Sequence, residues 1–542
     1  MRLHAAQSGE VLRHSAVETL LDEARVITQS LGGTPLARAA VEGRAPSGWY
    51  PHRPGSPNEW RSRAAHVQSR IDPRWFEHIA AAFVQREASD ARLTNAVVNN
   101  GIVVTTGQQP GLFGGPVYTT AKALSALAMA DAIEAVTGIP TAPVFWAATD
   151  DADFVEAATT CVVIDGVAHE LHMPHDPGSD GRPMYALPLP NLDGALAQLE
   201  AASGSSPDAR PISLVRRVYR GDGQRTVGSA FVEWAADLYG PLGISVLDAG
   251  HTAMREAAHD LLCRALKSAG SIEKAVAARD QAIRKAGYEP QVVGMAGRSL
   301  VFEIGSTKVR VPIDRAAAVA AGARPGDLSP NVLLRPIVEQ HLLPTMAYMA
   351  GPGELAYFAQ TSAVADALDL PAPLGVPRWS TAIVEPHVDR LADELDLELS
   401  DFQELHALQV RLAREVVPTA INEKLRNLRI AVDEGTAALQ NAVGQSESVP
   451  VRGEVVEGAR RSLQFRIDRL ERRVLAAAKH TDQARQRRLT AAAASLYPAG
   501  KRQERAANIL PFLARYGMRL LDVMRREAMR HAMLLVDGRP LT

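Results

Sequence analysis

The chain has very little cysteine: Cys161 and Cys263 are the only two among its 542 residues. Two thiols cannot build a disulfide framework, and they cannot supply the three or four cysteine ligands of a structural zinc site. We therefore expect both side chains to behave as small buried apolar groups.

Long apolar runs are also missing. The sequence contains no stretch of about 18 uncharged apolar residues, which a membrane-spanning helix requires, and no apolar segment led by lysine or arginine at its start. Apolar residues make up 46% and charged residues 22% of the chain, which is ordinary for a soluble globular protein. We predict a cytoplasmic protein with no membrane partner.

Several familiar catalytic motifs are absent as well. The chain has neither the G-x-x-x-x-G-K-[ST] loop of P-loop nucleotidases nor the G-x-S-x-G elbow of serine hydrolases. His169, His172 and His175 are spaced like metal ligands, but on the strand that we expect there His169 and His172 would point to opposite faces. We therefore predict no metal site at these histidines.

The formal net charge of −2 conceals an uneven distribution of charge. Residues 451–542 contain 20 lysines and arginines against 9 acidic residues, whereas residues 387–450 contain 12 acidic and 6 basic residues. A basic surface can bind nucleic acid, an acidic ligand or an acidic helix. Because no aromatic residues are interleaved with the basic ones, we favour pairing with the acidic helix and expect no nucleic-acid partner.

The most informative segment is glycine-rich and covers residues 106–122, TGQQPGLFGGPVYTTAK. It joins a β-branched run at 102–106 to a helical pattern at 118–137. Its four glycines allow backbone conformations that a Cβ would block, and the following helix N-terminus favours a negative charge. We predict a loop that binds a carboxylate or phosphate; a tight structural turn remains the alternative. The candidate substrate-binding residues here are Thr106, Gly107, Gln108, Gln109, Gly115, Tyr118 and Lys122.

An acidic run, Asp150, Asp151 and Asp153, follows a second apolar strand at 143–147. Strand, helix and strand together form a βαβ unit of a parallel sheet, and ligands bind at the carboxyl ends of such strands. We therefore expect the glycine-rich segment and the acidic run to face one cleft. Continued alternation would place Asp151 and Asp153 on one side, so we predict that these two are catalytic, as a general base or as ligands for an amine or Mg²⁺. A helix cap is the alternative.

Two later segments add polar residues between apolar ones. Glu354, Tyr357 and Gln360 are spaced to share one helical face, although a solvent-exposed face would give the same spacing. Arg335 and Arg378 lie between apolar stretches, and a partly buried arginine needs an anionic partner, either an internal carboxylate or the substrate. The substrate-binding residues predicted here are Glu354, Tyr357, Gln360, Arg378 and Ser380.

The pattern divides the chain into three parts. Residues 1–386 form an α/β core, with a helix near 17–30 and inserted segments at about 160–240 and 270–330. Residues 387–490 form an antiparallel coiled coil that turns near 444–453, is kinked at Pro418 and is a candidate dimer interface. Residues 491–542 return to the core, where Gln503, Arg505 and Asn508 either contact a nucleotide or dock the tail. The expected coiled-coil seam includes Leu425, Leu428, Val432, Leu439, Leu463, Ile467, Leu470 and Val474.

Three segments together resemble the bacillithiol biosynthesis cysteine-adding family BshC: residues 106–157, 328–386 and 497–517. The resemblance implies a Rossmann-like core, related to class I aminoacyl-tRNA synthetases and nucleotidylyltransferases, and a coiled coil that forms a homodimer. It also implies ligation of L-cysteine to the amine of glucosaminyl-malate, with ATP or ADP as a nucleotide by analogy.

The chain departs from this family in one position of the acidic run, where Ala152 replaces a histidine. It also lacks the two-histidine signature with which class I synthetases stabilise adenylate formation. These departures leave a second hypothesis open, in which the protein is a nucleotide-binding coiled-coil dimer that acts as a scaffold without catalysis.

Overall fold

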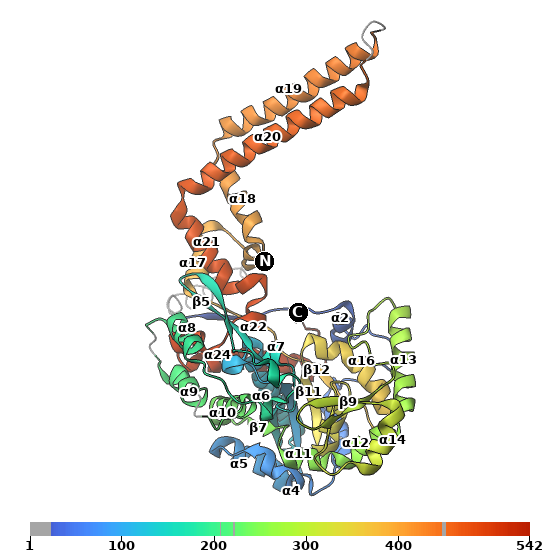
Figure 1. Ribbon diagram of the computed structural model, residues 1–542. Coiled ribbons are helices and arrows are strands. Elements are labelled where there is room, and N and C mark those ends of the chain that lie inside the picture. The colour runs from blue at the N-terminus through green and yellow to red at the C-terminus, as the bar shows by residue number, and fades with distance from the viewer. Residues whose placement is uncertain (1–22, 206–207, 221–222, 447–450, 542) are drawn as a thin grey trace, which may run out of the picture. The chain divides into compact units, whose positions relative to one another are not determined.

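The computed structural model describes residues 23–205, 208–220, 223–446 and 451–541 (Figure 1). The chain divides into two compact units. The described parts of residues 1–164, 168–384 and 501–542 form the first unit, and those of residues 165–167 and 385–500 form the second. None of the described helices has the length and apolar character needed to cross a membrane.

A six-stranded sheet lies at the centre of the first unit, in the order β12-β11-β3-β4-β7-β2. Every pair of neighbours is parallel except β7 and β2, which are antiparallel. The strands are β2 (Phe83–Val84), β3 (Ile102–Gln108), β4 (Thr141–Ala147), β7 (Ser245–Asp248), β11 (Thr345–Ala350) and β12 (Gly375–Pro377).

The predicted βαβ unit is confirmed. β3 continues through α6 (Val117–Thr137) into β4, and the two strands pair in parallel from Ile102 with Thr141 to Gln108 with Ala147. Ile102 and Val104 pack into one hydrophobic core and Val103 into another, on the opposite face of the sheet. Burial on both faces explains why these strands are continuous apolar runs.

Helices pack on both faces of the central sheet. Short helices and strands form the insertions of the first unit. The described N-terminal residues correct one prediction: Arg25–Thr28 is a strand, β1, that pairs antiparallel with β13 (Thr381–Val384). Its residues Val26, Ile27 and Thr28 favour extended backbone, and residues 17–22 lie outside the described ones. The strand expected around His169 and His172 is β6 (Val167–His172), which forms a two-stranded sheet with β5 (Thr159–Ile164). A separate antiparallel sheet has the order β10-β8-β9 (Leu328–Pro330, Arg298–Ile304 and Lys308–Pro312).

The helices of the first unit are α2 (Pro35–Val41), α3 (Pro57–Gln68), α4 (Trp75–Ile79), α5 (Glu87–Val98), α7 (Phe154–Ala157), α8 (Asp193–Ser203), α9 (Arg210–Val218), α10 (Val227–Tyr239), α11 (Thr252–Ala257), α12 (His259–Lys267), α13 (Ala269–Lys285), α14 (Ile313–Gly322), α15 (Arg335–Leu342), α16 (Pro352–Ala367), α22 (Gln503–Ala506), α23 (Leu510–Tyr516) and α24 (Arg519–Val536). The long helix α6 is buried over most of its length and packs against α24. Both cysteines are buried, as expected.

The second unit is helical and contains the predicted antiparallel pair, α19 (Thr419–Gly444) and α20 (Gly453–Thr481), drawn in orange in Figure 1. Pro418 breaks the helix instead of kinking it, because α18 ends at Val416 and Val417 is extended. This fits the restriction that proline places on the residue before it. The other helices here are α17 (Pro386–Leu395), α18 (Leu405–Val416) and α21 (Gln483–Leu496).

The contacts between α19 and α20 correct two predictions for the coiled coil, the pairing of its charges and the burial of its seam. Asp433 of α19 pairs with Arg460 of α20 at 3.2 Å in the predicted sense, but Arg429 of α19 pairs with Asp468 of α20 at 2.6 Å in the opposite sense. The seam is only partly buried: Ile467 is 5% exposed, whereas Leu439 is 53% exposed. Half of the eight expected seam residues, Leu428, Leu439, Leu463 and Leu470, are 43–53% exposed.

Candidate active site

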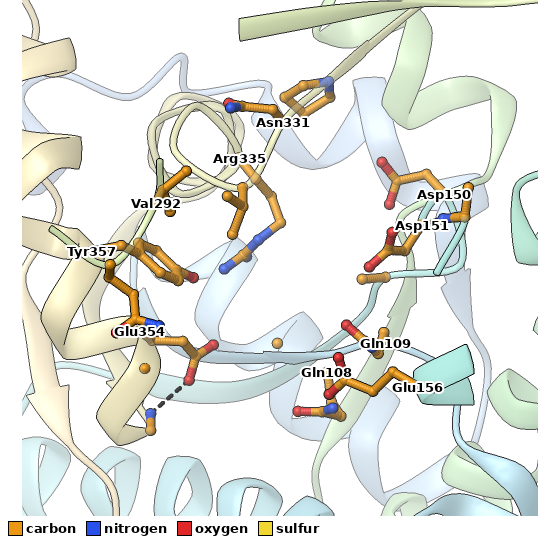
Figure 2. A pocket seen from close by; sticks show the side chains of 18 of the residues that line it. Gln108, Gln109, Asp150, Asp151, Glu156, Val292, Asn331, Arg335, Glu354 and Tyr357 are labelled. Carbon is orange, nitrogen blue, oxygen red and sulfur yellow. Dashed lines mark hydrogen bonds between the residues drawn. The ribbon is translucent and has the colours of Figure 1, made fainter. Parts of the chain in front are cut away.

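A cavity of about 680 Å³ opens at the carboxyl ends of the parallel strands (Figure 2). Gln108 at the end of β3 and Asp151 just after β4 both line it. The prediction that the glycine-rich segment and the acidic run face one cleft is therefore confirmed for these residues. Gly351 and Glu354 at the start of α16 form another part of the wall.

One wall carries carboxylates. Asp150 and Asp151 lie together on it, across the cavity from Arg335 and Tyr357 (Figure 2). Ser329 Oγ donates to Asp150 Oδ2 at 2.9 Å, and the amide of Ala152 donates to Asp151 Oδ1 at 2.7 Å. These bonds fix both carboxylates in the wall.

The environment of Asp151 alters its acidity. Burial raises the pKa of Asp151, and the nearby charge of Asp150 adds to this effect although Lys308 opposes it. A carboxylate whose protonated form is favoured takes up a proton more readily than an exposed one. Asp151 therefore has the properties of a general base.

Asp153 does not line the cavity, which corrects the predicted pair of Asp151 and Asp153. Its Oδ1 accepts from the amide of Glu156 at 3.2 Å and caps α7, the capping role that was the alternative. The alternation failed because the strand ends at Ala147 and the chain then turns, with the Asp151 amide donating to the carbonyl of Ala148. Asp150, and not Asp153, lines the cavity beside Asp151.

Lys122 and Glu354 form a buried pair at the floor of the cavity. Lys122 Nζ lies 2.7 Å from Glu354 Oε2 and also donates to the carbonyl of Gly107 at 2.7 Å. The amide of Gly351 donates to the same carboxylate at 2.6 Å. Burial alone raises the pKa of Glu354, but Lys122 outweighs it and holds this pKa below its usual range.

Arg335 lines the cavity on the side opposite the carboxylates, and its charge is paired with the buried carboxylate of Glu339. Its guanidinium donates to Glu339 at 2.9 Å and to the hydroxyl of Tyr348 at 3.0 Å, and it lies 5.1 Å from the centre of the Tyr348 ring. Tyr357 lines the cavity beside it. The sequence singled out Arg335 for its apolar surroundings without assigning it to the site.

Arg378 also lines the cavity, but an internal carboxylate neutralises its charge. Its two terminal nitrogens each lie 2.9 Å from an oxygen of Glu504, and both side chains are almost fully buried. Arg378 lies 5.7 Å from the centre of the Tyr118 ring. Of the two partners that the sequence left open, the described structure supplies the internal one.

Residues 111–117 of the glycine-rich segment form a packing element. A Cβ on Gly114 would lie 2.1 Å from an atom of Trp234, so glycine is needed for close approach. The first helical amide of α6, at Val117, donates to the carbonyl of Ala507 at 2.8 Å. The first amide of this helix is therefore already paired within the chain, and the close contact of Gly114 supports the alternative of a tight turn for this part of the loop. Only Gly107, Gln108 and Gln109 of the segment's loop face the cavity.

Other candidates lie behind the cavity wall. Thr106 Oγ1 donates to the carbonyl of Met349 at 2.8 Å, and Ser380 is buried beside Glu504. The Gln360 amide bonds both backbone groups of Val292, at 3.0 and 2.8 Å, and thereby positions a residue that does line the cavity. Besides Asp153, the predicted residues that do not line the cavity are Thr106, Gly115, Gln360, Ser380, Gln503 and Asn508.

The C-terminal segment docks on the core. The Gln503 amide bonds both backbone groups of Ile383, at 2.7 and 2.8 Å, and Asn508 Nδ2 donates to the carbonyls of Phe113 and Gly115 at 3.1 and 3.3 Å. Docking was the alternative for these two residues. Arg505 differs from them: it lines the cavity, is exposed and forms no ion pair with a described residue.

Sequence reasoning missed two cations on the β8–β9 hairpin. Lys308 and Arg310 line the cavity and both lie over the ring of Phe302, at 4.9 and 5.0 Å. Lys308 Nζ also donates to the carbonyl of Asp150 at 2.6 Å. Their spacing of two on a strand, which places both on one face, is the signal that could have found them.

Comparisons with known proteins cover nearly the whole chain. Residues 44–318 and 318–379 match the model of "Bacillithiol biosynthesis BshC, N-terminal Rossmann-like domain", and residues 381–533 match that of "Bacillithiol biosynthesis BshC, C-terminal coiled-coil domain". These matches confirm the predicted fold class, a Rossmann-like parallel-sheet core followed by a helical coiled coil.

Three relatives are each named "Putative cysteine ligase BshC". The protein of Koribacter versatilis is 31% identical over 438 residues, which cover 78% of this chain and 81% of that protein. The protein of Solibacter usitatus is 30% identical over 477 residues, 84% of this chain and 89% of that one. The protein of Salinibacter ruber is 29% identical over 500 residues, 86% and 90%.

Proposed function

The chain belongs to the bacillithiol biosynthesis BshC family, and on this premise we propose that it is a ligase joining the carboxyl group of L-cysteine to the amine of glucosaminyl-malate. The observation that carries the proposal is the charge pattern of the cavity. Carboxylates of Asp150 and Asp151 lie on one wall, and Arg335 lies on the opposite one.

This pattern suits a substrate that carries both kinds of charge. Glucosaminyl-malate has an amine and two carboxylates, so its amine fits the side of Asp151 and its malate group fits the side of Arg335. Arg335 already bonds to Glu339 and Tyr348, but a guanidinium carries five N–H groups and can donate to a further carboxylate. The volume of about 680 Å³ lies within the range of small-molecule sites, about 300–1,000 Å³.

The residues of the cavity can perform the proton transfer of the proposed reaction. The amine nitrogen attacks the carboxyl carbon of cysteine, a carbon–nitrogen bond forms, a carboxyl oxygen leaves and the nitrogen loses a proton. Asp151 accepts that proton, since its raised pKa matches the task. Asp150 helps to keep the Asp151 pKa raised, and Ser329 orients Asp150.

A nucleotide, ATP or ADP, would bind through side chains rather than through a helix end. The N-terminus of α6 does not fit a phosphate because Val117 already donates to Ala507. Lys308, Arg310 and Arg505 are the cavity cations that fit one. Bound ATP would supply a phosphate-based leaving group for the carboxyl oxygen of cysteine.

Nucleotide dependence is tested by incubating the purified protein with cysteine and glucosaminyl-malate, with and without ATP, and following the thiol product and ADP or AMP by mass spectrometry. We expect product only with ATP, together with its breakdown. Tight nucleotide binding with no product under either condition would favour the non-catalytic scaffold.

Arg505→Gln is expected to raise the KM for the anionic substrate that Arg505 contacts, ATP or glucosaminyl-malate, by about tenfold, because a hydrogen bond to a charged group contributes about 1.5–3 kcal/mol. The melting temperature should not change, since Arg505 forms no ion pair with a described residue. Steady-state kinetics provide the measurement. Arg502→Gln is the matched control: Arg502 donates to the carbonyl of Ser30 at 2.6 Å and does not line the cavity. An unchanged KM for both substrates in Arg505→Gln would remove Arg505 from the site.

We further propose that a second copy of the chain covers the exposed side of the coiled coil. Leu428, Leu439, Leu463 and Leu470 are each 43–53% exposed on α19 and α20. A cluster of exposed leucines at heptad spacing is typical of an interface. The heptad spacing that predicted the two helices therefore also predicts a homodimer.

Leu470→Glu is expected to convert this dimer to monomers, because it would bury a charge in the interface. Sedimentation equilibrium measures the mass. Val98→Glu is the control, since Val98 is 74% exposed on α5, outside the coiled coil. A wild-type protein with the mass of one chain would contradict the proposal, as would a Leu470→Glu variant that remains dimeric.

A further inference from the structure

A second cavity, of about 250 Å³, lies at the other end of the central sheet. It is lined by α3, by α15 and by the segment after α16, and Leu343 places it beside the start of β11 at Thr345. The candidate active site instead lies where β11 ends, at Gly351. The two cavities share no lining residue.

The lining of the second cavity combines basic and apolar side chains without any carboxylate. Arg63, His66, Arg70 and His341 are its basic residues, and its lining includes no aspartate or glutamate among the residues that the structure describes. Most of the rest are apolar, among them Ile71, Leu343 and Leu370. A cavity of this kind favours a ligand that is negatively charged at one end and apolar over the remainder.

Arg63 is a cation without an anion. Its Nε donates to the carbonyl of Met346 at 2.8 Å, at the bulge where the register of β11 shifts between Thr345 and Ala347. No described carboxylate forms an ion pair with it, and burial lowers the pKa of Arg63 to about 10. Burial of a charged guanidinium destabilises the fold unless an anion pairs with it.

Gln340 adds a second unpaired group. Its amide nitrogen donates to the carbonyl of Pro371 at 2.9 Å, and its amide oxygen is buried without a donor among the described residues. The orientation of the amide is fixed because the Pro371 carbonyl can only accept. A buried acceptor without a partner costs about 1–3 kcal/mol, which a ligand donor would recover.

We infer that this cavity is a binding site for a small organic carboxylate with an apolar body and an N–H or O–H group. The carboxylate pairs with Arg63, the apolar body packs against Ile71 and Leu370, and the donor reaches Gln340. The ligand is small because 250 Å³ lies below the range of about 300–1,000 Å³ that drug-sized ligands occupy. This site is independent of the ligase reaction.

Indole-3-acetate is a suitable probe, since it has a carboxylate, an apolar ring system and one N–H. We expect saturable binding to the full chain by isothermal titration calorimetry, with a Kd of about 1 mM or lower. Arg63→Gln should weaken binding at least about tenfold through loss of the charged contact. Indole-3-acetamide, which lacks the charge, should bind more weakly to the wild type.

Ala372→Phe provides an independent test, because it fills the cavity and leaves the bond from Arg63 to Met346 in place. It should abolish binding, whereas Arg61→Gln, an exposed position on the same helix outside the cavity, should not change it. Absence of saturable binding to the wild type would overturn the inference. Binding that survives Ala372→Phe would overturn it equally, because the probe would then occupy another site such as the active-site cavity.

Discussion

Asp151→Asn is expected to lower kcat by about 10²–10⁴-fold, the range that a general base contributes, with little change in melting temperature. The substitution removes the basic carboxylate, but asparagine keeps an oxygen that can accept from the Ala152 amide as Asp151 Oδ1 does at 2.7 Å. Initial rates of product formation and thermal unfolding of the same preparation provide the two measurements.

Asp153→Asn is the matched control, two residues away. Asp153 caps α7 outside the cavity, and asparagine caps helices as well as aspartate does. Its kcat should therefore stay close to that of the wild type. If Asp153→Asn abolished activity and Asp151→Asn retained it, the assignment of Asp151 as the base would be wrong.

Glu504→Gln is expected to lower the free energy of unfolding by about 3–5 kcal/mol, the cost of leaving one partner of a buried ion pair without the other. Arg378 is 2% exposed, and both of its terminal nitrogens bond to Glu504. Glu504 also accepts from the Thr381 amide at 3.2 Å and so holds the C-terminal segment on β13. Chemical denaturation measures the loss.

Glu527→Gln is the control on the last long helix. It breaks a pair with Arg530, whose side chain is 74% exposed, and exposed pairs contribute about 0–1 kcal/mol. Equal losses for Glu504→Gln and Glu527→Gln would contradict the proposed stabilising role of the buried pair.

The effect of Glu504→Gln should also depend on pH. Burial alone raises the pKa of Glu504 in the folded protein. Arg378 outweighs this effect and holds the pKa below its ordinary value of 4.5. The pair is therefore fully stabilising above about pH 4.5, and its contribution is lost as the pH falls through the folded pKa. The difference in unfolding free energy between the wild type and Glu504→Gln should narrow below pH 4.5.

The strands and helices of the core could be predicted because their signals are local. The apolar runs at 102–106 and 143–147 and the helical pattern at 118–137 each indicate one element, and the rule for parallel sheets then places the cavity at the strand ends. For this reason Gln108 and Asp151 could be assigned to a common cleft before any coordinates were known.

The contacts that long-range folding creates could not be predicted in this way. Gly114 is glycine because Trp234 packs against it, and the N-terminus of α6 is satisfied by Ala507, which is nearly 400 residues away in the chain. Neither partner gives a signal in the glycine-rich segment itself. A loop that binds an anion and a loop that packs against a distant tryptophan have the same local sequence pattern.

Lys308 and Arg310 show a second reason why part of the site could not be predicted from the sequence. Their spacing predicts a shared strand face, but only the packing of β8 and β9 over the strand ends brings that face to Asp150. The site therefore needs residues from an insertion as well as from the core. Strand alternation also failed at Asp153, where the chain had already left the strand.

Mass spectrometry of a reaction containing purified protein, L-cysteine, glucosaminyl-malate and ATP tests the proposed ligase activity most directly. We predict a product whose mass equals the sum of cysteine and glucosaminyl-malate less one water, formed at similar rates by the wild type and Asp153→Asn and about 10²–10⁴-fold more slowly by Asp151→Asn. No product from a wild-type protein that still binds both substrates would contradict the proposed function.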